Sequence, residues 1–348
     1  MPKVAVDAGG ADLGPAEVAA GAGLAAQRGI EILLFGPADE MAALPAGVEV
    51  VDAPISIAKA ADPAFAVRST PEASIVQATR AVAKGRAQAL VSGGSTGSAL
   101  AAGLFNIRRD RGIYRPALAL PLPIPGARPV LLLDVGANVA CRPEHLVQFA
   151  HMGSAFCQAV LGFDKPRVAL LSNGEEPGKG TPDLIAVHEQ LMGQGGTGLN
   201  FIGNIEGTHI TSGMADVVVM DGFTGNITLK VIEGVSARTM RAIDELALVS
   251  PRARLGSRLF APAMVALREE IDPETPGGAY MLGLRQLGVV AHGRFTKRGF
   301  ARAIEVAALG VREDVIARTR AALEAAGALR KPTRSTQANL PSEHAATV

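Results

Sequence analysis

Residues 130–161 read VLLLDVGANVACRPEHLVQFAHMGSAFCQAVL, and this stretch carries the pattern that decides the fold. Its four apolar residues Val130–Leu133 predict a strand that is buried on both faces. A polar turn, Asp134–Asn138, follows, and Pro143–Leu161 then has the length and apolar content of a covering helix. A buried strand, a turn and a helix in this order indicate one βα unit of a parallel sheet.

The same alternation extends from this unit in both directions. Further strands are predicted at Lys3–Val6, Glu31–Phe35, Val48–Val51, Ala87–Val91, Val168–Leu171, Asn200–Ile202 and Asp216–Met220. Further helices are predicted at Pro15–Arg28, Glu72–Lys84, Thr96–Ile107 and Asp183–Gly193. Apolar strands separated by helices favour a three-layer α/β/α fold with a mostly parallel sheet.

The C-terminal third is richer in helix. Gly225–Glu270 is predicted to be almost entirely helical, with breaks at Ser250-Pro251 and at Pro262. Pro273–Gly288 predicts a loop, and Val289–Ala291 predicts a short strand. A terminal pair of helices is expected over Phe295–Ala326.

Domain organisation follows from these elements. We expect residues 1–330 to form a single catalytic unit of two closely packed α/β parts, with a soft boundary near residues 140–163. The polar residues 331–348, which include Pro and Ser, predict a disordered tail.

Composition excludes several classes of protein. Of 348 residues, 48% are hydrophobic but only 4% are aromatic, so Ala, Val, Leu and Gly must fill the interior. A net charge of +1 provides no global field for nucleic acid. Cys141 and Cys157 are too few for a disulfide framework or a four-ligand metal site. With no run of about 18 apolar residues and no signal-peptide core before Asp7, a cytoplasmic protein is expected.

Six polar or glycine-rich turns follow predicted strands. They are Asp7–Asp12, Ser92–Gly97, Asp134–Asn138, Ser172–Gly180, Gly203–Gly207 and Asp221–Asn226. A single such turn closes most α/β units and indicates little. The carboxyl ends of parallel strands form the ligand crevice of an open sheet, so we expect the six turns to converge on one cleft.

The turn Gly94-Ser95-Thr96-Gly97 opens a predicted helix. Backbone N–H groups made accessible by glycine, hydroxyl donors and the helix dipole together suit phosphate. A helix cap made by Ser95 or Thr96 would explain the same residues. The turn is neither a P-loop nor a dinucleotide fingerprint, because neither glycine spacing is present.

Lys179 and Asn226 are the candidate catalytic residues. Lys179 lies between Gly178 and Gly180, where its ammonium group can hold phosphate or stabilise an oxyanion. It could instead pair with the nearby Glu175 or Glu176. Asn226 offers an amide that donates and accepts without titrating, or it could cap the helix that follows.

A wider set of polar residues is expected to line the cleft. Its members are Asp7, Asp12, Asn138, Glu175, Asn204, Glu206, Asp221 and His292. Asp7 and Asp12 could equally be turn-formers. His292 follows an apolar strand, where a general acid or phosphate ligand could stand, although a structural histidine is the slightly favoured reading. Cys141 shows no legible catalytic arrangement.

With these loops identified, the sequence resembles the phosphate acyltransferases of bacterial phospholipid synthesis, the PlsX family. The similarity runs from about Lys3 to about Val311. Its most specific stretches are Leu132–Ser154, Gly174–Gly180, Asn200–Gly207 and Asp216–Gly234. The resemblance implies a fold similar to phosphotransacetylases and isocitrate-dehydrogenase-like enzymes, a two-part homodimer with its active cleft between the parts.

The sequence departs from the family pattern at several positions. Gly9 stands for a Met and Ala11 for a Gly in the Asp7–Asp12 turn, and Gly93 and Ser95 stand for Ala and Asn in the Ser92–Gly97 turn. The family's basic segment is reduced to Val67–Ser74. Ala140 replaces an Asp, and Arg294-Phe295 replaces two serines.

The resemblance implies transfer of an acyl group from acyl carrier protein to inorganic phosphate. Phosphate can attack without a strong base and a thiol leaves readily, so the site must mainly supply positioning and oxyanion stabilisation. We assign these roles to Lys179 and Asn226, with phosphate donors from Ser95–Gly97. Asn138, Asn204 and Glu206 would shape the cleft, and neither a metal nor an organic cofactor is expected.

Two surfaces are candidates for partner contacts. Arg108, Arg109, Arg111 and Arg115 form a basic cluster that could receive the acidic carrier protein, or a merely solvated face. Residues 252–268 mix arginines with apolar side chains and could rest peripherally on an anionic membrane. The apolar members singled out are Leu255, Leu259, Phe260 and Met264. Dimer or core packing is the alternative explanation of the second surface.

Two other functions stay open at this stage. One is a phosphotransacetylase-like enzyme that uses acyl-coenzyme A and phosphate. The other is a non-catalytic paralogue that still binds acyl carrier protein or membrane. A nicotinamide dehydrogenase is disfavoured, because no dinucleotide-binding glycine pattern follows a strand.

Overall fold

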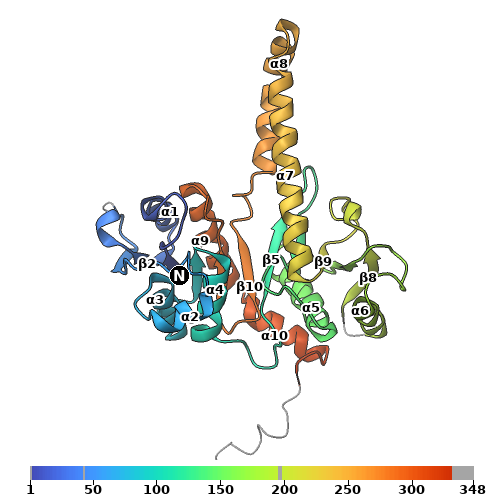
Figure 1. Ribbon diagram of the computed structural model, residues 1–348, viewed down its shortest axis with the longest axis horizontal. Helices are drawn as coiled ribbons and strands as arrows, with labels where there is room; N and C mark the ends of the chain where they lie inside the picture. Colours follow the sequence, from blue (N-terminus) through green and yellow to red (C-terminus); the bar gives the residue numbers. More distant parts are fainter. Residues whose placement is uncertain (1, 42–43, 195–197, 331–348) are drawn as a thin grey trace, which may run out of the picture.

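A computed structural model describes residues 2–41, 44–194 and 198–330 and, within them, one eleven-stranded sheet (Figure 1). The predicted tail at 331–348 lies outside the described residues. The strands are β1 (Lys3–Asp7), β2 (Glu31–Gly36), β3 (Val48–Asp52), β4 (Ala89–Ser92), β5 (Ala117–Leu122), β6 (Val130–Leu133), β7 (Arg167–Leu171), β8 (Asn200–Ile205), β9 (Val217–Val219), β10 (Ala279–Leu282) and β11 (Leu287–Val290). Their order across the sheet is β3-β2-β1-β4-β11-β10-β5-β6-β9-β7-β8.

Helices cover both faces of this sheet. They are α1 (Pro15–Gln27), α2 (Pro63–Ser69), α3 (Ser74–Ala83), α4 (Thr96–Ala102), α5 (Pro143–Val160), α6 (Pro182–Gly193), α7 (Gly222–Leu246), α8 (Pro251–Glu270), α9 (Lys297–Arg312) and α10 (Val315–Ala325). A π-helical turn, η2 (Gly103–Ile107), prolongs α4. Side chains alternate across each strand, so Val4 and Val6 of β1 pack in the core beneath α1 and α9, while Ala5 packs in the core beneath α3. The predicted three-layer, mostly parallel fold is confirmed.

The centre of the sheet is antiparallel. β10 runs against both β11 and β5, and β5 runs against β6. One side of the sheet therefore consists of strands that point opposite to β6, β9, β7 and β8. These strands are β3, β2, β1, β4 and β11. A usual twist of about 20–25° per strand would accumulate to roughly 140–175° between β1 and β7, enough to turn the two sets of carboxyl ends toward a common side.

Two sequence predictions about proline and loops are wrong. The stretch Pro273–Gly288 contains β10 and the start of β11 rather than a loop, and β5 was missed because Pro121 interrupts its apolar run. Pro121 lies beyond Ala117–Ala119, the part of β5 that pairs with β10, so its missing N–H is tolerated. The short helix α2 was also missed.

The predicted break at Pro262 is wrong as well, because α8 continues through it. Proline frees a carbonyl one turn earlier, and α8 has no buried residue, so water can satisfy that group. The break at Ser250-Pro251 is confirmed, since Ser250 caps α8. The terminal helix pair is confirmed as α9 and α10.

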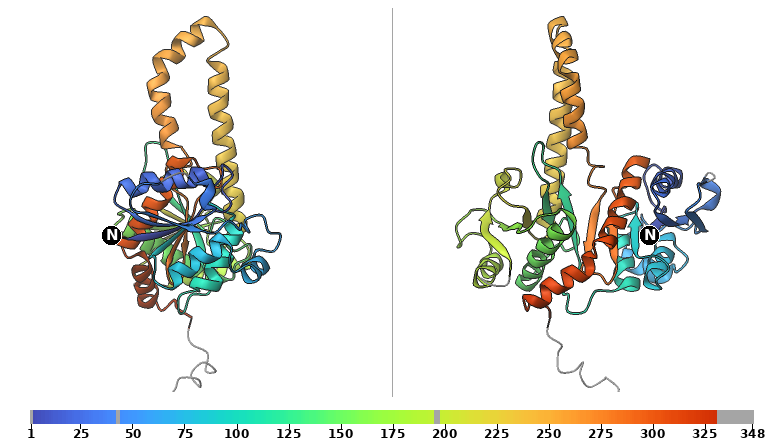
Figure 2. Two further views of the ribbon diagram at one scale, coloured as in Figure 1. Left: turned by 90° about the vertical axis from the view of Figure 1, so that its left-hand side faces the viewer. Right: turned by 180° about the vertical axis from the view of Figure 1, so that it is seen from behind.

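The helices α7 and α8 form a hairpin that projects far beyond the sheet (Figures 1 and 2). The views show the two helices splayed, and an ion pair between Arg268 and Asp244 links them. Within the described residues, no helix is long and apolar enough to cross a membrane. The predicted soft boundary near residues 140–163 falls on α5, beneath a sheet that is continuous across both parts.

Candidate active site

The first loop is built around Asp7, at the carboxyl end of β1. Its buried carboxylate accepts hydrogen bonds from the hydroxyls of Ser74 at 2.6 Å and Ser92 at 2.8 Å, and from the N–H of Gly9 at 3.0 Å. Burial is the main cause that raises the pKa of Asp7 to about 6, against the opposing effect of these hydrogen bonds. Asp7 therefore braces the loop from inside rather than facing a ligand.

The raised pKa of Asp7 predicts how stability depends on pH. Between about pH 4 and pH 6 the folded chain holds a proton that the unfolded chain has released, so the stabilisation is full below pH 4 and is lost as pH rises through 6. Relative to Asp7→Asn, the wild type should lose on the order of 3 kcal/mol of unfolding free energy from pH 4 to pH 7. Urea unfolding across this range measures the difference. Asp52→Asn, at the exposed end of β3, is the control, and a pH-independent Asp7→Asn difference would contradict the prediction.

The predicted phosphate loop lies against the first loop. A Cβ on Gly10 would come within 3.1 Å of the Cα of Gly94, so the two turns touch. Ser95 caps α4, accepting from the N–H of Ser98 at 3.2 Å. The capping alternative is thus confirmed for Ser95. Thr96 and Gly97 form the first turn of α4.

A second loop is organised by Asp134, at the carboxyl end of β6. Its fully buried carboxylate accepts from the backbone N–H groups of Leu118, Gly136, Ala137 and Asn138 at 2.8–3.1 Å, and from the Asn138 side-chain amide at 2.8 Å. Burial is the main cause that raises the pKa of Asp134, and these hydrogen bonds oppose it. Asn138 also donates to the carbonyl of Pro116 at 2.7 Å, so its amide is committed to holding the loop.

The amino end of α7 packs directly on this second loop. Asp221 caps α7, accepting from the N–H and hydroxyl of Thr224 at 2.9 and 2.8 Å. The alternative that Asn226 caps this helix is therefore wrong. Asn226 is exposed one turn into α7 and donates only a long bond, 3.4 Å, to the carbonyl of Val135. Its amide is left largely available at the mouth of the second loop.

Lys179 lies on the exposed loop after β7, and the parallel neighbour β9 leads at the same sheet edge into Asp221 and the first turns of α7, which contain Asn226. Its aliphatic stem crosses Gly174, where a Cβ would lie 2.6 Å from the lysine Cγ. In the described part of the chain, no carboxylate lies within ion-pair distance of its ammonium. Glu175 pairs instead with His209, at 3.2 Å. The pairing alternative for Lys179 is therefore not realised.

The loop after β7 is anchored from β8. The side-chain amide of Asn204 donates to the carbonyl of Glu176 at 3.0 Å, while its oxygen lies 2.9 Å from Nδ1 of the buried His188. Glu206 is exposed and precedes a short turn that includes His209. Asn204 thus supports Lys179 through the loop, and Glu206 stands at its rim.

His292, which follows β11, lies close to α7, which follows β9. The two sides of the sheet therefore approach each other at this point. Burial is the main cause that lowers the pKa of His292, and the nearby Lys230 lowers it further. Glu233 and Asp12 are also close enough to act on it, and Asp12 pairs with Arg294 at 3.8 Å. Nδ1 of His292 accepts from the Arg294 N–H at 3.2 Å, so its Nε2 faces outward as a donor when neutral.

The sequence of this chain is similar to that of a known protein family over most of its length. A family model described as "Fatty acid synthesis protein" matches residues 2–318. The phosphate acyltransferase of Moorella thermoacetica is 42% identical over 321 residues, covering 90% of this chain and 94% of that protein. The chain belongs to the phosphate acyltransferase (PlsX) family. A second phosphate acyltransferase, from Pelotomaculum thermopropionicum, is 40% identical over 329 residues, covering 92% of this chain and 95% of that protein.

Solved structures show the same fold at low identity. A phosphotransacetylase from Streptococcus pyogenes superposes with a TM-score of 0.59 at 16% identity, covering 89% of this chain and 94% of that one. A branched-chain phosphotransacylase from Enterococcus faecalis gives 0.55 at 17%, covering 89% and 100%. The expected phosphotransacetylase-like fold of this PlsX-family chain is confirmed.

Several residues of the site in this PlsX-family protein were not predicted from the sequence. Asp134 was quoted in its loop but not chosen, and Ser74 lies inside a predicted helix. Lys230 and Glu233 were not considered, although they follow Asn226 by four and seven residues and so share its helix face. The missed signal was this spacing on a helix that starts at a strand end.

Two departures from the PlsX pattern have a structural reason. A side chain at Gly9 would meet the Ser74 hydroxyl at 2.1 Å, and one at Gly93 would meet the Phe300 ring at 2.7 Å. Both glycines thus leave room for the Ser74 and Phe300 side chains. Cys141 is a poor nucleophile, because burial is the main cause that raises its pKa to about 12.

Proposed function

We propose that this protein transfers a fatty acyl group from acyl carrier protein to inorganic phosphate, giving an acyl phosphate for phospholipid synthesis. The observation that carries the proposal is the placement of Lys179 and Asn226 at one sheet edge, without carboxylate partners in the described chain, in a PlsX-family protein. An unpaired ammonium and a free amide suit an anionic acceptor and a developing oxyanion.

In the proposed reaction, a phosphate oxygen attacks the thioester carbonyl carbon. The tetrahedral oxyanion collapses, the C–S bond breaks, and the electron pair leaves on sulfur, which takes a proton from solvent. A thiol with a pKa of about 8.5 needs little acid assistance. Lys179 and Asn226 would stabilise the oxyanion, and the Thr96–Gly97 turn would add donors to phosphate. No acyl-enzyme is required, which agrees with the high pKa of Cys141.

The direct test mixes purified protein, palmitoyl-acyl carrier protein and phosphate. Phosphate-dependent release of the free carrier thiol, matched by acyl phosphate, supports the proposal. No release from this donor, with turnover of acyl-coenzyme A, favours the phosphotransacetylase-like alternative, which the fold likeness to phosphotransacetylases keeps in play. The absence of turnover with both donors favours the non-catalytic paralogue.

We further propose that the protein is a homodimer joined through the α7–α8 hairpin. Phe223, Ile227, Val231 and Val235 recur every four residues on α7 and are all exposed. Burying such a stripe against a second copy would remove it from water. Sedimentation equilibrium should give twice 35.7 kDa, and a monomer at micromolar concentration would contradict this proposal.

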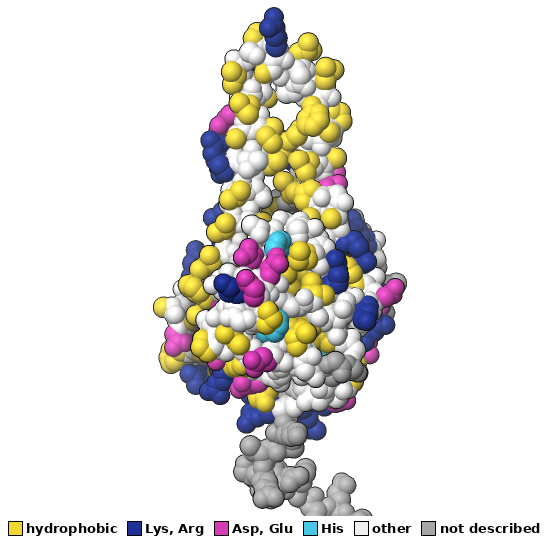
Figure 3. Space-filling view, turned by 90° about the vertical axis from the view of Figure 1, so that its right-hand side faces the viewer, with side chains coloured by type: hydrophobic (Ala, Val, Ile, Leu, Met, Phe, Trp, Pro, Cys, Tyr) yellow, Lys and Arg dark blue, Asp and Glu magenta, His cyan; other side chains and the backbone are white. Residues whose placement is uncertain are grey.

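We propose that the end of the hairpin rests on a membrane surface, and that the protein is cytoplasmic with peripheral attachment. Figure 3 shows apolar side chains over the hairpin, with basic ones beside them. The side chains of Leu255, Leu259 and Phe260 are 60–79% exposed, and Met264 is half-buried. The core-packing alternative is therefore wrong within the protomer.

Membrane attachment predicts a loss of vesicle binding on substitution. Leu255→Asp/Leu259→Asp should weaken binding to vesicles containing anionic lipid by more than about tenfold, since two apolar side chains are no longer buried. Turnover of a soluble donor should not change. Phe65→Asp on α2, where the side chain is 62% exposed like Leu255, is the matched control. Unchanged vesicle flotation of the double variant would remove the proposal.

A further inference from the structure

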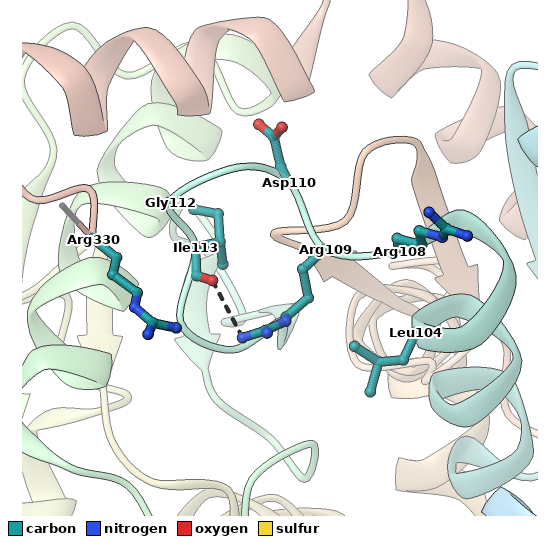
Figure 4. A pocket seen from close by; sticks show the side chains of 7 residues that line it. All are labelled: Leu104, Arg108, Arg109, Asp110, Gly112, Ile113 and Arg330. Atoms are coloured by element: carbon teal, nitrogen blue, oxygen red, sulfur yellow. Dashed lines mark hydrogen bonds between the residues drawn. The ribbon is translucent and has the colours of Figure 1, made fainter. Parts of the chain in front are cut away.

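A basic hollow lies at the end of the molecule where α10 packs, away from the projecting hairpin (Figures 1 and 4). Its volume is about 370 Å³, and we name it the arginine groove. It is lined by Leu104, Arg108, Arg109, Asp110, Ile113 and Arg330. Figure 4 shows Arg108 and Arg330 on opposite sides of it, with the Arg330 guanidinium turned toward Arg109 and the Arg108 side chain turned the other way.

Charge in the arginine groove is not balanced. Asp110, its single acidic lining residue, is already paired with Arg320 at 2.9 Å. The Arg109 guanidinium donates to the carbonyls of Ile113 and Tyr114 rather than to a carboxylate. Within the described ranges, Arg108 and Arg330 make no ion pair. The groove thus presents positive charge that nothing in the described protomer neutralises.

A second arginine-lined hollow, between α1 and α9, shows the contrast. There Arg28 and Arg302 both pair with Glu305, and Asp272 and Glu274 also line the hollow. Arginines in that hollow are balanced within the chain, as expected for structural surface pairs. The arginine groove lacks this compensation.

The arginine groove is also held rigidly. Gln148 of α5 is buried and accepts from the N–H of Tyr114 at 2.8 Å, while its amide donates to the carbonyls of Gly112 and Ala328 at 2.9 and 2.8 Å. This one side chain clamps the two segments that carry the arginines. Arg108 itself adopts the left-handed region, φ 71°, and its backbone is bonded on both sides, to Gly103 and Arg285. Such backbone strain concentrates at functional positions.

The segment that carries Arg108 connects both sides of the cleft. It follows α4 and η2, which begin at the Ser95 turn and span on the order of 18 Å at 1.5 Å per residue. It ends at Pro116, whose carbonyl accepts from Asn138 in the second loop. A partner seated on the groove would therefore lie within reach of the site for a flexible thioester arm.

We infer that the arginine groove is the docking surface for an acidic helix of the protein that delivers the thioester, and this rests on the proposed function. A neighbouring hollow shares Arg330 and continues along Tyr114, Glu144 and Leu329, so the hollowed surface beside the arginines extends beyond the size of a small ligand. Carboxylates along one face of a helix would be attracted to the guanidiniums of this surface. The occupant is the acyl carrier protein.

The test uses Arg108→Glu/Arg330→Glu in the full chain. Binding of labelled, unacylated holo-acyl carrier protein, followed by fluorescence anisotropy, should weaken by about tenfold or more, and wild-type binding should weaken as salt rises. In turnover, KM for acyl-acyl carrier protein should rise similarly, while kcat stays at the wild-type value. Arg28→Glu/Arg298→Glu carries the same change in net charge at the balanced hollow and should bind normally.

Three outcomes would overturn the inference. They are carrier binding by the double variant within twofold of wild type, an equal loss of binding in the control variant, or a loss of kcat in place of the rise in KM. Binding of inorganic phosphate or of anionic vesicles that depends on Arg108 and Arg330, with no carrier binding, would assign the groove to a small anion or a membrane instead. Carrier binding that depends on Arg108 and Arg330, in a protein without phosphate-dependent transfer, would uphold the docking surface and reject the proposed function.

Discussion

Lys179→Ala is expected to lower kcat/KM for phosphate-dependent acyl transfer by about 10²–10³-fold, the loss typical of removing one preorganised donor to a developing oxyanion. The lysine is exposed, caps no element, and has no carboxylate within ion-pair distance in the described chain, so little of its role is structural. The unfolding midpoint in urea should therefore remain that of the wild type. Initial rates at varied phosphate separate an effect on KM from one on kcat.

Lys165→Ala provides the matched control for this experiment. Lys165 is also exposed, but it precedes β7 whereas Lys179 follows it, so the two lysines lie at opposite ends of one strand. Its removal should leave turnover within about twofold. A fully active Lys179→Ala enzyme would remove the lysine from the proposed mechanism and leave Asn226 and the Thr96–Gly97 turn as its remaining donors.

Gly225→Ala is expected to destabilise the fold by about 3 kcal/mol or more and to abolish turnover. A Cβ at this position would lie 1.9 Å from the carbonyl oxygen of Asp134, a backbone atom that cannot move aside without breaking the second loop. Overpacking against a flexible side chain costs about 1–3 kcal/mol, and the rigid contact here belongs at the upper end. The residue also adjoins Asn226, so any shift of α7 displaces the proposed donor.

Gly234→Ala tests the same substitution on the same helix without the contact. No atom lies within 4 Å of a Cβ at Gly234, and alanine favours a helix interior over glycine by about 1 kcal/mol. This control should unfold at equal or higher urea concentration than the wild type. Equal stability of the two variants would mean that α7 does not pack on Asp134 as described.

Most of the sheet could be predicted from the sequence, because its strands other than the edge strands β3 and β8 are largely buried on both faces and therefore read as continuous apolar runs. Val130–Leu133 is observed with the predicted bounds, and the predicted strand at Val168–Leu171 differs from β7 by one residue. The central strands failed for a local reason. β5 contains Pro121, and β10 lies among glycines and prolines, so both resemble loops until their partners are known.

The site was predictable in its parts but not in its assembly. The loops at Lys179 and Asn226 can be recognised in the sequence, because glycines lie beside polar residues there. The roles of Asp7 and Asp134 could not be read in this way, because a buried carboxylate that braces a loop and one that faces a ligand have the same local sequence. Burial and the direction of the surrounding N–H groups separate these roles, and both depend on residues far away, such as Ser74 and Leu118.

The sequence by itself determined the βα repeat, the layer architecture, the PlsX resemblance and the set of polar loops, since each depends on residues close together in the chain. The tertiary structure alone decided how these loops meet. Antiparallel pairing around β10 sends the strands of the two halves in opposite directions, and the sheet twist with α7 brings Lys230 beside His292. It also gathered Arg108 and Arg330, more than 200 residues apart, around one groove. Such long-range juxtapositions follow from packing, which no local pattern encodes.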